Sequence, residues 1–205
     1  LNADEKLLLQ RSAEMGQRYF TSQNGASALT EEEWNRLHSS VYPQLLGGAR
    51  VVIQGAGKVG SSVMRELERY NVHIVAVADR DGAVIGSNLP VDALIESVKS
   101  HGSVVHCSDG VDRVIEGSRE GAEVLTLECD ILVPAALEHA ITSHNAEAVQ
   151  APLVVCGSNG PITARAAKTL HEKGCLVVYD FLANSGGVTA SYFEWLRNLY
   201  ERYRF

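Results

Sequence analysis

From Arg50 onward the chain alternates between short apolar runs and longer segments in which apolar and polar residues follow a helical spacing. Strands are predicted over the apolar runs Val51–Gln54, His73–Ala78, Asp130–Val133, Leu153–Cys156 and Leu176–Tyr179, with a weaker one over Val124–Leu127. Helices are predicted over Lys58–Tyr70, Val91–Ser100, Leu137–Ala140, Thr163–Lys173 and Gly187–Tyr203. Continuous runs of Val, Ile and Leu are typical of parallel strands buried on both faces. The pattern therefore predicts an α/β fold with a doubly wound parallel sheet.

The N-terminal part of the chain follows a helical pattern instead. Apolar positions at roughly helical spacing predict an amphipathic helix over residues 3–20, which serves packing or dimerisation. The small polar residues 21–28 are predicted to be a linker. Thr30 and Glu33 then form a capping box, which starts a helix that runs to about Leu46.

Gly47 and Gly48 end this helix and divide the chain into two parts. Residues 1–48 are predicted to form a helical N-terminal extension, and residues 49–205 an α/β domain that ends in a long helix. A chain of 205 residues can bury a substantial core. Its 45% of hydrophobic and 21% of charged residues are ordinary for a globular protein, so we expect it to fold.

The charge of the chain argues against two classes of partner. A formal net charge of -7 disfavours binding to nucleic acids and to anionic membranes. No apolar run reaches the length of a membrane-spanning helix, and Leu1–Lys6 lacks the basic and then apolar order of a secretory signal. We therefore expect a cytoplasmic protein, and a homo-oligomer is compatible with the sequence. Because residue 1 is Leu rather than Met, we also expect that the chain was excised from something longer or processed.

Four cysteines are spread along the chain without a Cys-x-x-Cys pair: Cys107, Cys129, Cys156 and Cys175. The favoured interpretation is buried free thiols. An alternative metal site would consist of His101, His106, Cys107 and Asp109. Their spacing matches no familiar zinc pattern and the stretch is predicted to be a loop, so no metal is assigned.

The string Gly55-Ala56-Gly57-Lys58-Val59-Gly60 follows the first predicted strand directly and opens the next helix. In this context it predicts a dinucleotide-binding turn, and the predicted sheet is then Rossmann-like. Gly55 allows the tight turn, Gly57 lets the backbone approach a pyrophosphate, and Gly60 lets the helix pack closely on the strand. The helix N-terminus offers N–H groups and a partial positive charge to the phosphates. Lys58 either adds a positive charge there or is a solvated side chain.

A candidate for the ribose contact lies at the end of the second predicted strand. Asp79 stands about 20 residues after the glycine string, where an acidic side chain accepts hydrogen bonds from the ribose hydroxyls of the adenosine. This carboxylate favours NAD, because it would repel a 2′-phosphate. Arg80 leaves NADP open, since its guanidinium could pair with that phosphate. The alternative interpretation of Asp79-Arg80-Asp81-Gly82 is a polar turn after a strand.

Four motifs in a fixed order resemble those of the glutamate, leucine, phenylalanine and valine dehydrogenases, and most of all the glutamate dehydrogenases. They are the glycine string, Cys129–Glu138, Ser158–Thr163 and Asp180–Trp195. The resemblance runs from Gly55 to about Asn198 and matches the C-terminal, NAD(P)-binding domain of that family. It implies the cofactor-binding domain of an NAD(P)-dependent amino-acid dehydrogenase, which converts glutamate to a 2-oxo acid by oxidative deamination.

The resemblance also implies roles for residues beyond the glycine string. Ala135 and Ala136 would line the cofactor groove, while Asn159 and Asn184 would bond the nicotinamide ribose and carboxamide. Each lies just beyond the C-terminal end of a predicted strand, where open parallel sheets bind ligands. The alternative is that these four residues only form turns between strands and helices.

Val188 and Ser191 match family positions that face the substrate. In the glutamate-specific members the serine hydroxyl donates to the distal carboxylate of the substrate. The alternative for Ser191 is a serine at a helix start. The resemblance thus implies glutamate rather than a branched or aromatic amino acid.

The sequence departs from the family at several positions. Lys58 replaces the usual asparagine, Cys156 the usual acidic residue and Ser158 the usual alanine. Residues 1–50 hold nothing like the glycine- and lysine-rich motif that carries the family's catalytic lysines and aspartate. No catalytic residue is therefore assigned, and we expect the chain to lack the catalytic domain and to bind cofactor without turnover.

Two other functions compete with a dehydrogenase. A non-catalytic dinucleotide-sensing or assembly module derived from the family would explain the replaced residues and the unmatched N-terminus. A purely structural domain with an empty groove is disfavoured by the joint presence of Asp79, Asn159 and Asn184.

Overall fold

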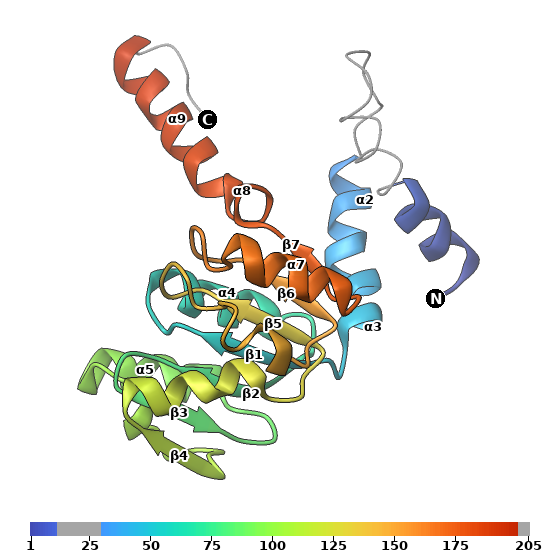
Figure 1. Ribbon diagram of the computed structural model, residues 1–205. Helices are drawn as coiled ribbons and strands as arrows, with labels where there is room; N and C mark the ends of the chain where they lie inside the picture. The colour runs from blue at the N-terminus through green and yellow to red at the C-terminus, as the bar shows by residue number, and fades with distance from the viewer. Residues whose placement is uncertain (12–29, 201–205) are drawn as a thin grey trace. The chain divides into compact units, whose positions relative to one another are not determined.

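The computed structural model of the chain describes residues 1–11 and 30–200 (Figure 1). The chain divides into two compact units. One unit consists of Leu1–Gly48 with Glu66–Val72, and the other of Ala49–Arg65 with His73–Phe205. The described part of the first unit is helical, and the second unit contains the sheet. The division into domains 1–48 and 49–205 stays a prediction.

The second unit is built on a seven-stranded sheet in the order β4-β3-β2-β1-β5-β6-β7, which can be followed by the labels in Figure 1. The strands are β1 (Arg50–Gln54), β2 (His73–Ala78), β3 (Gly82–Ile85), β4 (Arg113–Glu116), β5 (Ile131–Pro134), β6 (Leu153–Val155) and β7 (Leu176–Val178). Strands β2, β1, β5, β6 and β7 pair in parallel, which confirms the predicted Rossmann-like α/β fold. The chain builds outward from β1 in one direction and from β5 in the other. The crevice beyond the carboxyl ends of these two strands is where such sheets bind ligands.

Two strands at one edge of the sheet were not predicted. β3 pairs antiparallel with β2, and β4 pairs antiparallel with β3. β3 contains Gly82 and Ala83, which weaken the strand signal, and Ile115 is the one buried residue of β4. The sheet is therefore mixed at this edge rather than parallel throughout.

Helices follow most of the strands along the chain. They are α4 (Lys58–Glu68), α5 (Val91–His101), α6 (Ser118–Gly121), α7 (Ala164–Glu172), α8 (Asp180–Ala183) and α9 (Ser185–Tyr200), with 3-10 turns η2 (Val104–His106), η3 (Ala122–Thr126) and η4 (Ala146–Ala148). The helices predicted near α4, α5, α7 and α9 are confirmed, although the predicted end of the last at Tyr203 lies outside the described residues. In the described parts of the chain, no helix has the length and hydropathy needed to cross a lipid bilayer.

Two predicted elements are wrong. The weak strand predicted over Val124–Leu127 overlaps the 3-10 turn η3, because a short apolar run does not distinguish a strand from a helical turn. The helix predicted over Leu137–Ala140 is a turn, because the backbone N–H groups of His139 and Ile141 donate to the loop after β6. Its His139 takes a left-handed φ of 57° and donates its N–H to the Gly160 carbonyl at 2.9 Å.

The two faces of the sheet bury different residues of the same strands. Val52, Leu132 and Val154 share a buried cluster with Leu125 of η3 and Leu170 of α7. On α4, a Cβ built at Gly60 would lie 3.7 Å from Ile53 Cγ2, so this helix packs on the Ile53 side of β1. Close packing of α4 at its first turn brings the start of the helix to the end of β1.

The first unit begins with a helical segment over residues 3–11. It continues with α2 (Glu31–Arg36), a π-helical turn η1 (Leu37–Val41) and α3 (Tyr42–Leu46). The predicted capping box is confirmed, because the Glu33 N–H donates to Thr30 Oγ1 at 3.1 Å and the Thr30 N–H donates to Glu33 Oε2 at 2.9 Å. The predicted linker 21–28 and the second half of the first helix lie outside the described residues.

Candidate functional site

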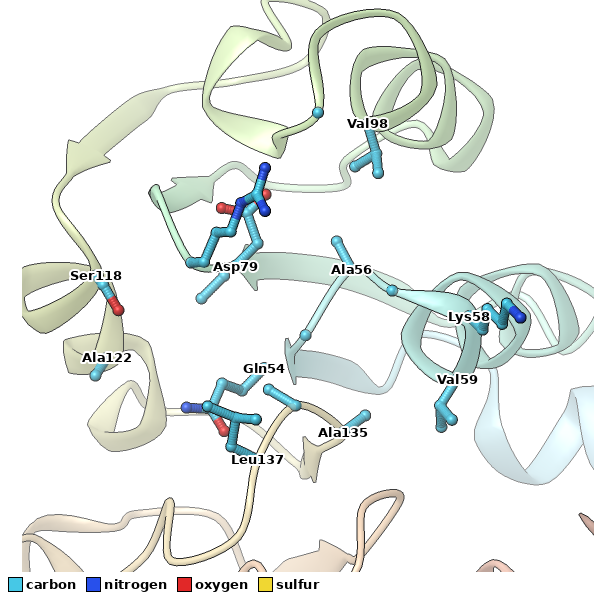
Figure 2. Close-up of a pocket in the computed structure, with 16 residues that line it drawn as sticks. Gln54, Ala56, Lys58, Val59, Asp79, Val98, Ser118, Ala122, Ala135 and Leu137 are labelled. Atoms are coloured by element: carbon cyan, nitrogen blue, oxygen red, sulfur yellow. The ribbon is translucent and has the colours of Figure 1, made fainter.

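A groove of about 600 Å³ opens beyond the carboxyl ends of β1, β2 and β5. Its lining consists of Gln54, Gly55, Ala56, Gly57, Lys58, Val59, Ala78, Asp79, Arg80, Val98, Gly102, Ser118, Ala122, Ala135, Ala136 and Leu137. Figure 2 shows Lys58 and Val59 at one end of the groove and Ser118 and Ala122 at the other, with Asp79 on one side between them. The volume falls within the range of about 300–1,000 Å³ that is usual for small-molecule sites.

The three glycines of the loop meet different surroundings. Gly55 has a φ of +113°, and a Cβ built on it would lie 2.6 Å from the Ala135 carbonyl oxygen. A Cβ on Gly60 would lie 1.7 Å from the Gly55 carbonyl oxygen, so Gly60 supports the packing of α4 and does not line the groove. A Cβ on Gly57 would have no heavy atom within 4 Å among its described surroundings. Packing within the protein explains Gly55 and Gly60, whereas Gly57 faces the open groove.

Lys58 and Val59 form the first residues of α4 and line the groove. The first N–H groups of a helix have no partner within the helix and carry a partial positive charge. The exposed ammonium side chain of Lys58 adds a positive charge at the same end. This end of the groove therefore favours an anionic group.

Asp79 stands at the end of β2, where the sequence predicted it, but its carboxylate already has protein partners. Oδ1 accepts the hydroxyl of Ser103 and the N–H of Asp81, both at 2.9 Å. Oδ2 accepts the N–H of Val104 at 2.7 Å. Asp79 thus fixes the chain segment that follows α5 as well as lining the groove.

Arg80 lines the groove next to Asp79 and is largely exposed, with 80% of its side-chain surface open. Its Nε lies 3.5 Å from Asp81 Oδ2, in an ion pair with a half-exposed partner. Exposed pairs of this kind are worth only about 0–1 kcal/mol. The guanidinium is therefore available to a ligand.

Gln54, the last residue of β1, lines the groove although it was not predicted to do so. Its Oε1 is buried and has no hydrogen-bond partner among the described residues. Buried polar atoms are normally paired, because an unpaired one costs about 1–3 kcal/mol. A donor from a ligand or from water would satisfy this atom.

Ala135 and Ala136 line the groove directly after β5, as the sequence predicted for their position. The Ala135 N–H donates to the Gln54 carbonyl at 2.7 Å, which continues the pairing of β5 with β1 past the end of the strand. Gly55 approaches Ala135 closely, so the loop after β1 packs directly against the loop after β5.

Asn159 and Asn184 are brought together, because Asn184 Nδ2 donates to Asn159 Oδ1 at 2.7 Å. Beside them Asp180 Oδ2 accepts the Gly160 N–H at 2.8 Å, and this hydrogen bond lowers the pKa of Asp180 below its ordinary value. The two asparagines do not line the groove of about 600 Å³. They form a second polar cluster beyond the ends of β6 and β7.

Val188 and Ser191 both lie on α9 and do not line the groove. Val188 is 70% exposed, and Ser191 is exposed as well. Nothing in the described structure assigns either residue to a ligand, so their substrate role stays a prediction.

Sequence reasoning missed several residues at the groove, among them Gln54, Ser118 and Ala122. Gln54 carried a signal, since it is a polar residue at the end of an apolar strand and directly before the glycine loop. Ser118 and Ala122 carried none, because the antiparallel edge β3–β4 that brings them here was itself not predicted. Ser103, which binds Asp79 from 24 residues away, also gave no local signal.

The cysteines and the alternative metal ligands do not line the groove. All four cysteines are free, and Cys107, Cys129 and Cys156 are buried. Burial raises the pKa of Cys129 and of Cys156 to about 11, so both remain thiols at neutral pH. Over residues 1–11 and 30–200, no three His, Cys, Asp or Glu side chains are grouped to hold a metal ion.

Comparison with known proteins identifies similar chains over most of this length. A family model described as Glutamate/Leucine/Phenylalanine/Valine dehydrogenase matches residues 17–204. The NADP-specific glutamate dehydrogenase of Saccharolobus shibatae is 38% identical over 90% of this chain and 41% of its own length. The NAD-specific glutamate dehydrogenase of Staphylococcus aureus is 42% identical over 74% of this chain and 35% of its own length.

A solved structure of a glutamate dehydrogenase is also similar to this chain. The hetero-hexameric glutamate dehydrogenase of Thermus thermophilus in its leucine-bound form superposes with a TM-score of 0.67 and 36% identity, over 78% of this chain and 36% of that one. The chain thus spans about two fifths or less of the length of these relatives.

Proposed function

Because this chain belongs to the glutamate/leucine/phenylalanine/valine dehydrogenase family, we propose that its groove binds the cofactor NAD(P) for an amino-acid dehydrogenase. Glutamate is the favoured substrate, to be converted to a 2-oxo acid by oxidative deamination. The relatives named as glutamate dehydrogenases support this choice, and so does the predicted role of Ser191. We further propose a cytoplasmic protein that works in amino-acid metabolism as an oligomer.

The observation that carries the proposal is the open space in front of Gly57. At Gly55 and Gly60 the protein's own backbone leaves no room for a Cβ, but no such reason applies to Gly57. A pyrophosphate placed against the loop would need that space. The unpaired Oε1 of Gln54 supports the same conclusion, since it is a buried acceptor at the groove with no protein partner.

Different residues of the chain bind different parts of the dinucleotide. The N–H groups at the start of α4 and the ammonium of Lys58 hold the pyrophosphate by hydrogen bonds and charge. Ala135 and Ala136 form an apolar wall, and Asn159 with Asn184 orient the nicotinamide ribose and carboxamide. When bound, the nicotinamide supplies hydride transfer to or from the substrate α-carbon. No general acid or base is assigned within this chain, so we expect binding without glutamate-dependent cofactor reduction.

Gly57→Ala tests the proposal without disturbing the fold. The added methyl meets no protein atom in the described structure, so the melting temperature should stay unchanged. The same methyl would stand where the pyrophosphate approaches, and overpacking of about 1–3 kcal/mol weakens NADH binding by about 5- to 150-fold. Titration of NADH fluorescence against the wild type and the variant measures this loss.

Gly186→Ala is the matched control, because it also adds a methyl into open space but on α9, outside the groove. It should bind NADH as the wild type does. Equal affinity of Gly57→Ala and the wild type, or failure of the wild type to bind NADH and NADPH at millimolar concentration, would refute the proposed function.

A further inference from the structure

Two histidines come together directly after α5. His101 is the last residue of α5, and His106 is the last residue of η2. Their ring centroids lie 5.4 Å apart, with an angle of 50° between the ring planes, and both residues are exposed. Neither histidine lines the groove, so the proposed function does not use this pair.

The separation of the two rings fits a shared metal ion. A bond between Zn²⁺ and a ring nitrogen measures about 2.0–2.1 Å, which places the ion about 3.2 Å from the centroid of the ring. Two imidazoles at the tetrahedral angle around one ion would then have their centroids about 5.2 Å apart. The observed separation of 5.4 Å is close to this value. Rotation of the two side chains is therefore enough to bring one nitrogen of each ring to the same ion.

The backbone between the two histidines is held by contacts of its own. The Ser103 hydroxyl and the Val104 N–H donate to the Asp79 carboxylate at 2.9 and 2.7 Å. The Ser97 hydroxyl donates to the Ser103 carbonyl at 2.8 Å, and the Cys107 N–H donates to the Val104 carbonyl at 2.9 Å. A site whose frame is already ordered loses less conformational entropy when it binds an ion.

The chemistry of the ligands selects the class of metal. Imidazole nitrogen suits Zn²⁺, Cu²⁺ and Ni²⁺, whereas Mg²⁺ and Ca²⁺ prefer oxygen. In the four-residue metal site considered from the sequence, Cys107 was a third ligand, but it is buried and its thiol donates to the Asp109 carbonyl at 3.8 Å. Burial raises the pKa of this thiol above its ordinary value, and metals bind the thiolate rather than the thiol. The structure thus keeps the two histidines as ligands and leaves the other positions on the ion to water.

An aromatic contact alone would also bring the rings to this distance, since ring centroids pack about 4.5–7 Å apart. Because both histidines are exposed, such a contact would remove little surface from water. Arg80 would repel a cation, since its Nη2 would lie 3.7 Å from a Cβ built on Gly102. Its charge is largely exposed and is paired with Asp81 at 3.5 Å, so solvent and salt weaken this repulsion.

We propose that His101 and His106 bind a divalent transition-metal ion of the Zn²⁺ class, with water completing its coordination. The ion joins the end of α5 to η2 and closes the segment whose Ser103 and Val104 hold Asp79. The inference goes beyond the proposed function and does not depend on it, because neither ligand lines the groove.

Isothermal titration calorimetry of the chain with Zn²⁺ alone tests the proposal. The wild type should bind Zn²⁺ saturably, with a dissociation constant below about 1 mM, and should show no such binding of Mg²⁺. His101→Ala and His106→Ala should each weaken Zn²⁺ binding by about tenfold or more, because the second bond to an ion that is already held is intramolecular. Since both side chains are exposed, urea unfolding without metal should be the same in the variants and the wild type.

The double variant His101→Ala/His106→Ala should bind Zn²⁺ within about threefold of either single variant, because each single change already removes the chelate. His144→Ala is the matched control, since it removes an exposed histidine from the turn before η4 and should leave Zn²⁺ binding unchanged.

Three results would overturn the proposal and leave the two rings as an aromatic contact only. They are the absence of saturable Zn²⁺ binding up to millimolar concentration, binding that neither single variant weakens, and losses in His144→Ala equal to those in His101→Ala and His106→Ala. Because no cofactor enters this experiment, its failure would not bear on the dinucleotide site, and a failure of NADH binding would not bear on this metal site.

Discussion

Asp180 ties together the polar residues that follow β6 and β7. Its Oδ2 accepts the Gly160 N–H at 2.8 Å, and its own carbonyl accepts the Asn184 N–H at 2.9 Å. Asn184 in turn donates to Asn159, so one short segment positions both asparagines that are proposed to hold the nicotinamide. The order of this cluster should depend on the charge of a single carboxylate.

This dependence predicts an effect of pH at Asp180. The Gly160 N–H lowers the pKa of Asp180 in the folded chain below its ordinary value of 3.8. A carboxyl whose pKa is lowered on folding stabilises the fold above its unfolded pKa, and this stabilisation is lost as the pH falls through the folded value. The difference in unfolding free energy between the wild type and Asp180→Asn should therefore be constant above about pH 5 and shrink toward zero in acid. Urea unfolding at a series of pH values measures it, and a difference that stays constant into acid would contradict the assigned bond.

At the residue scale, the sequence was most informative where a position requires glycine, because of its backbone conformation or because no Cβ fits there. The spacing of the loop pointed to Gly55, Gly57 and Gly60; packing within the protein accounts for Gly55 and Gly60, and the role of Gly57 stays a prediction. The partners of Asp79 could not be predicted, because Ser103 lies 24 residues away and reaches it only through the tertiary fold. A local pattern therefore located the acid but not its hydrogen bonds.

Among the elements, the 3-10 turn η4 relies on a side chain from another part of the chain. Nζ of Lys173, just after α7, donates to the carbonyls of Ala146, Glu147 and Val149, the last at 2.7 Å. These carbonyls at the end of the turn would otherwise need other donors. Lys173 thus connects η4 to the end of α7.

Lys173→Met should destabilise the chain by about 1–3 kcal/mol, because it removes the donor and keeps most of the apolar stem. Lys168→Met, within α7, is the matched control. Its ammonium makes an exposed pair with Glu172 at 3.8 Å, so the change should cost less than about 0.5 kcal/mol. Equilibrium unfolding in urea measures the loss of unfolding free energy in each variant. Equal losses in the two variants would contradict a stabilising role of the three carbonyl contacts.

The predicted elements were correct where an apolar run was long or a helix had clear ends. β2 coincides with its predicted residues, and α4, α5 and α7 differ from theirs by a few residues at their ends. β3 and β4 were missed because a short antiparallel edge with Gly82 and a single buried residue lacks a continuous apolar run. Since that edge brings Ser118 to the groove, this part of the site could not be predicted either.

Over the whole molecule, the order of the strands explains where the groove lies. Because β1 pairs with β2 on one side and with β5 on the other, the loops after these three strands meet at one place. The glycine loop, Asp79 and Ala135 come from these loops. The chain matches the family over residues 17–204 and spans 35–41% of the length of the first relatives.

The measurement that tests this account most directly is an amide NMR titration of the chain with NADH. We predict saturable shifts at Gly55, Gly57, Lys58 and Val59, with a second group at Ala135 and Ala136, because these residues line the groove. The absence of shifts at millimolar NADH, or shifts confined to α9 or to the N-terminal helices, would contradict the central claim that this groove holds the dinucleotide.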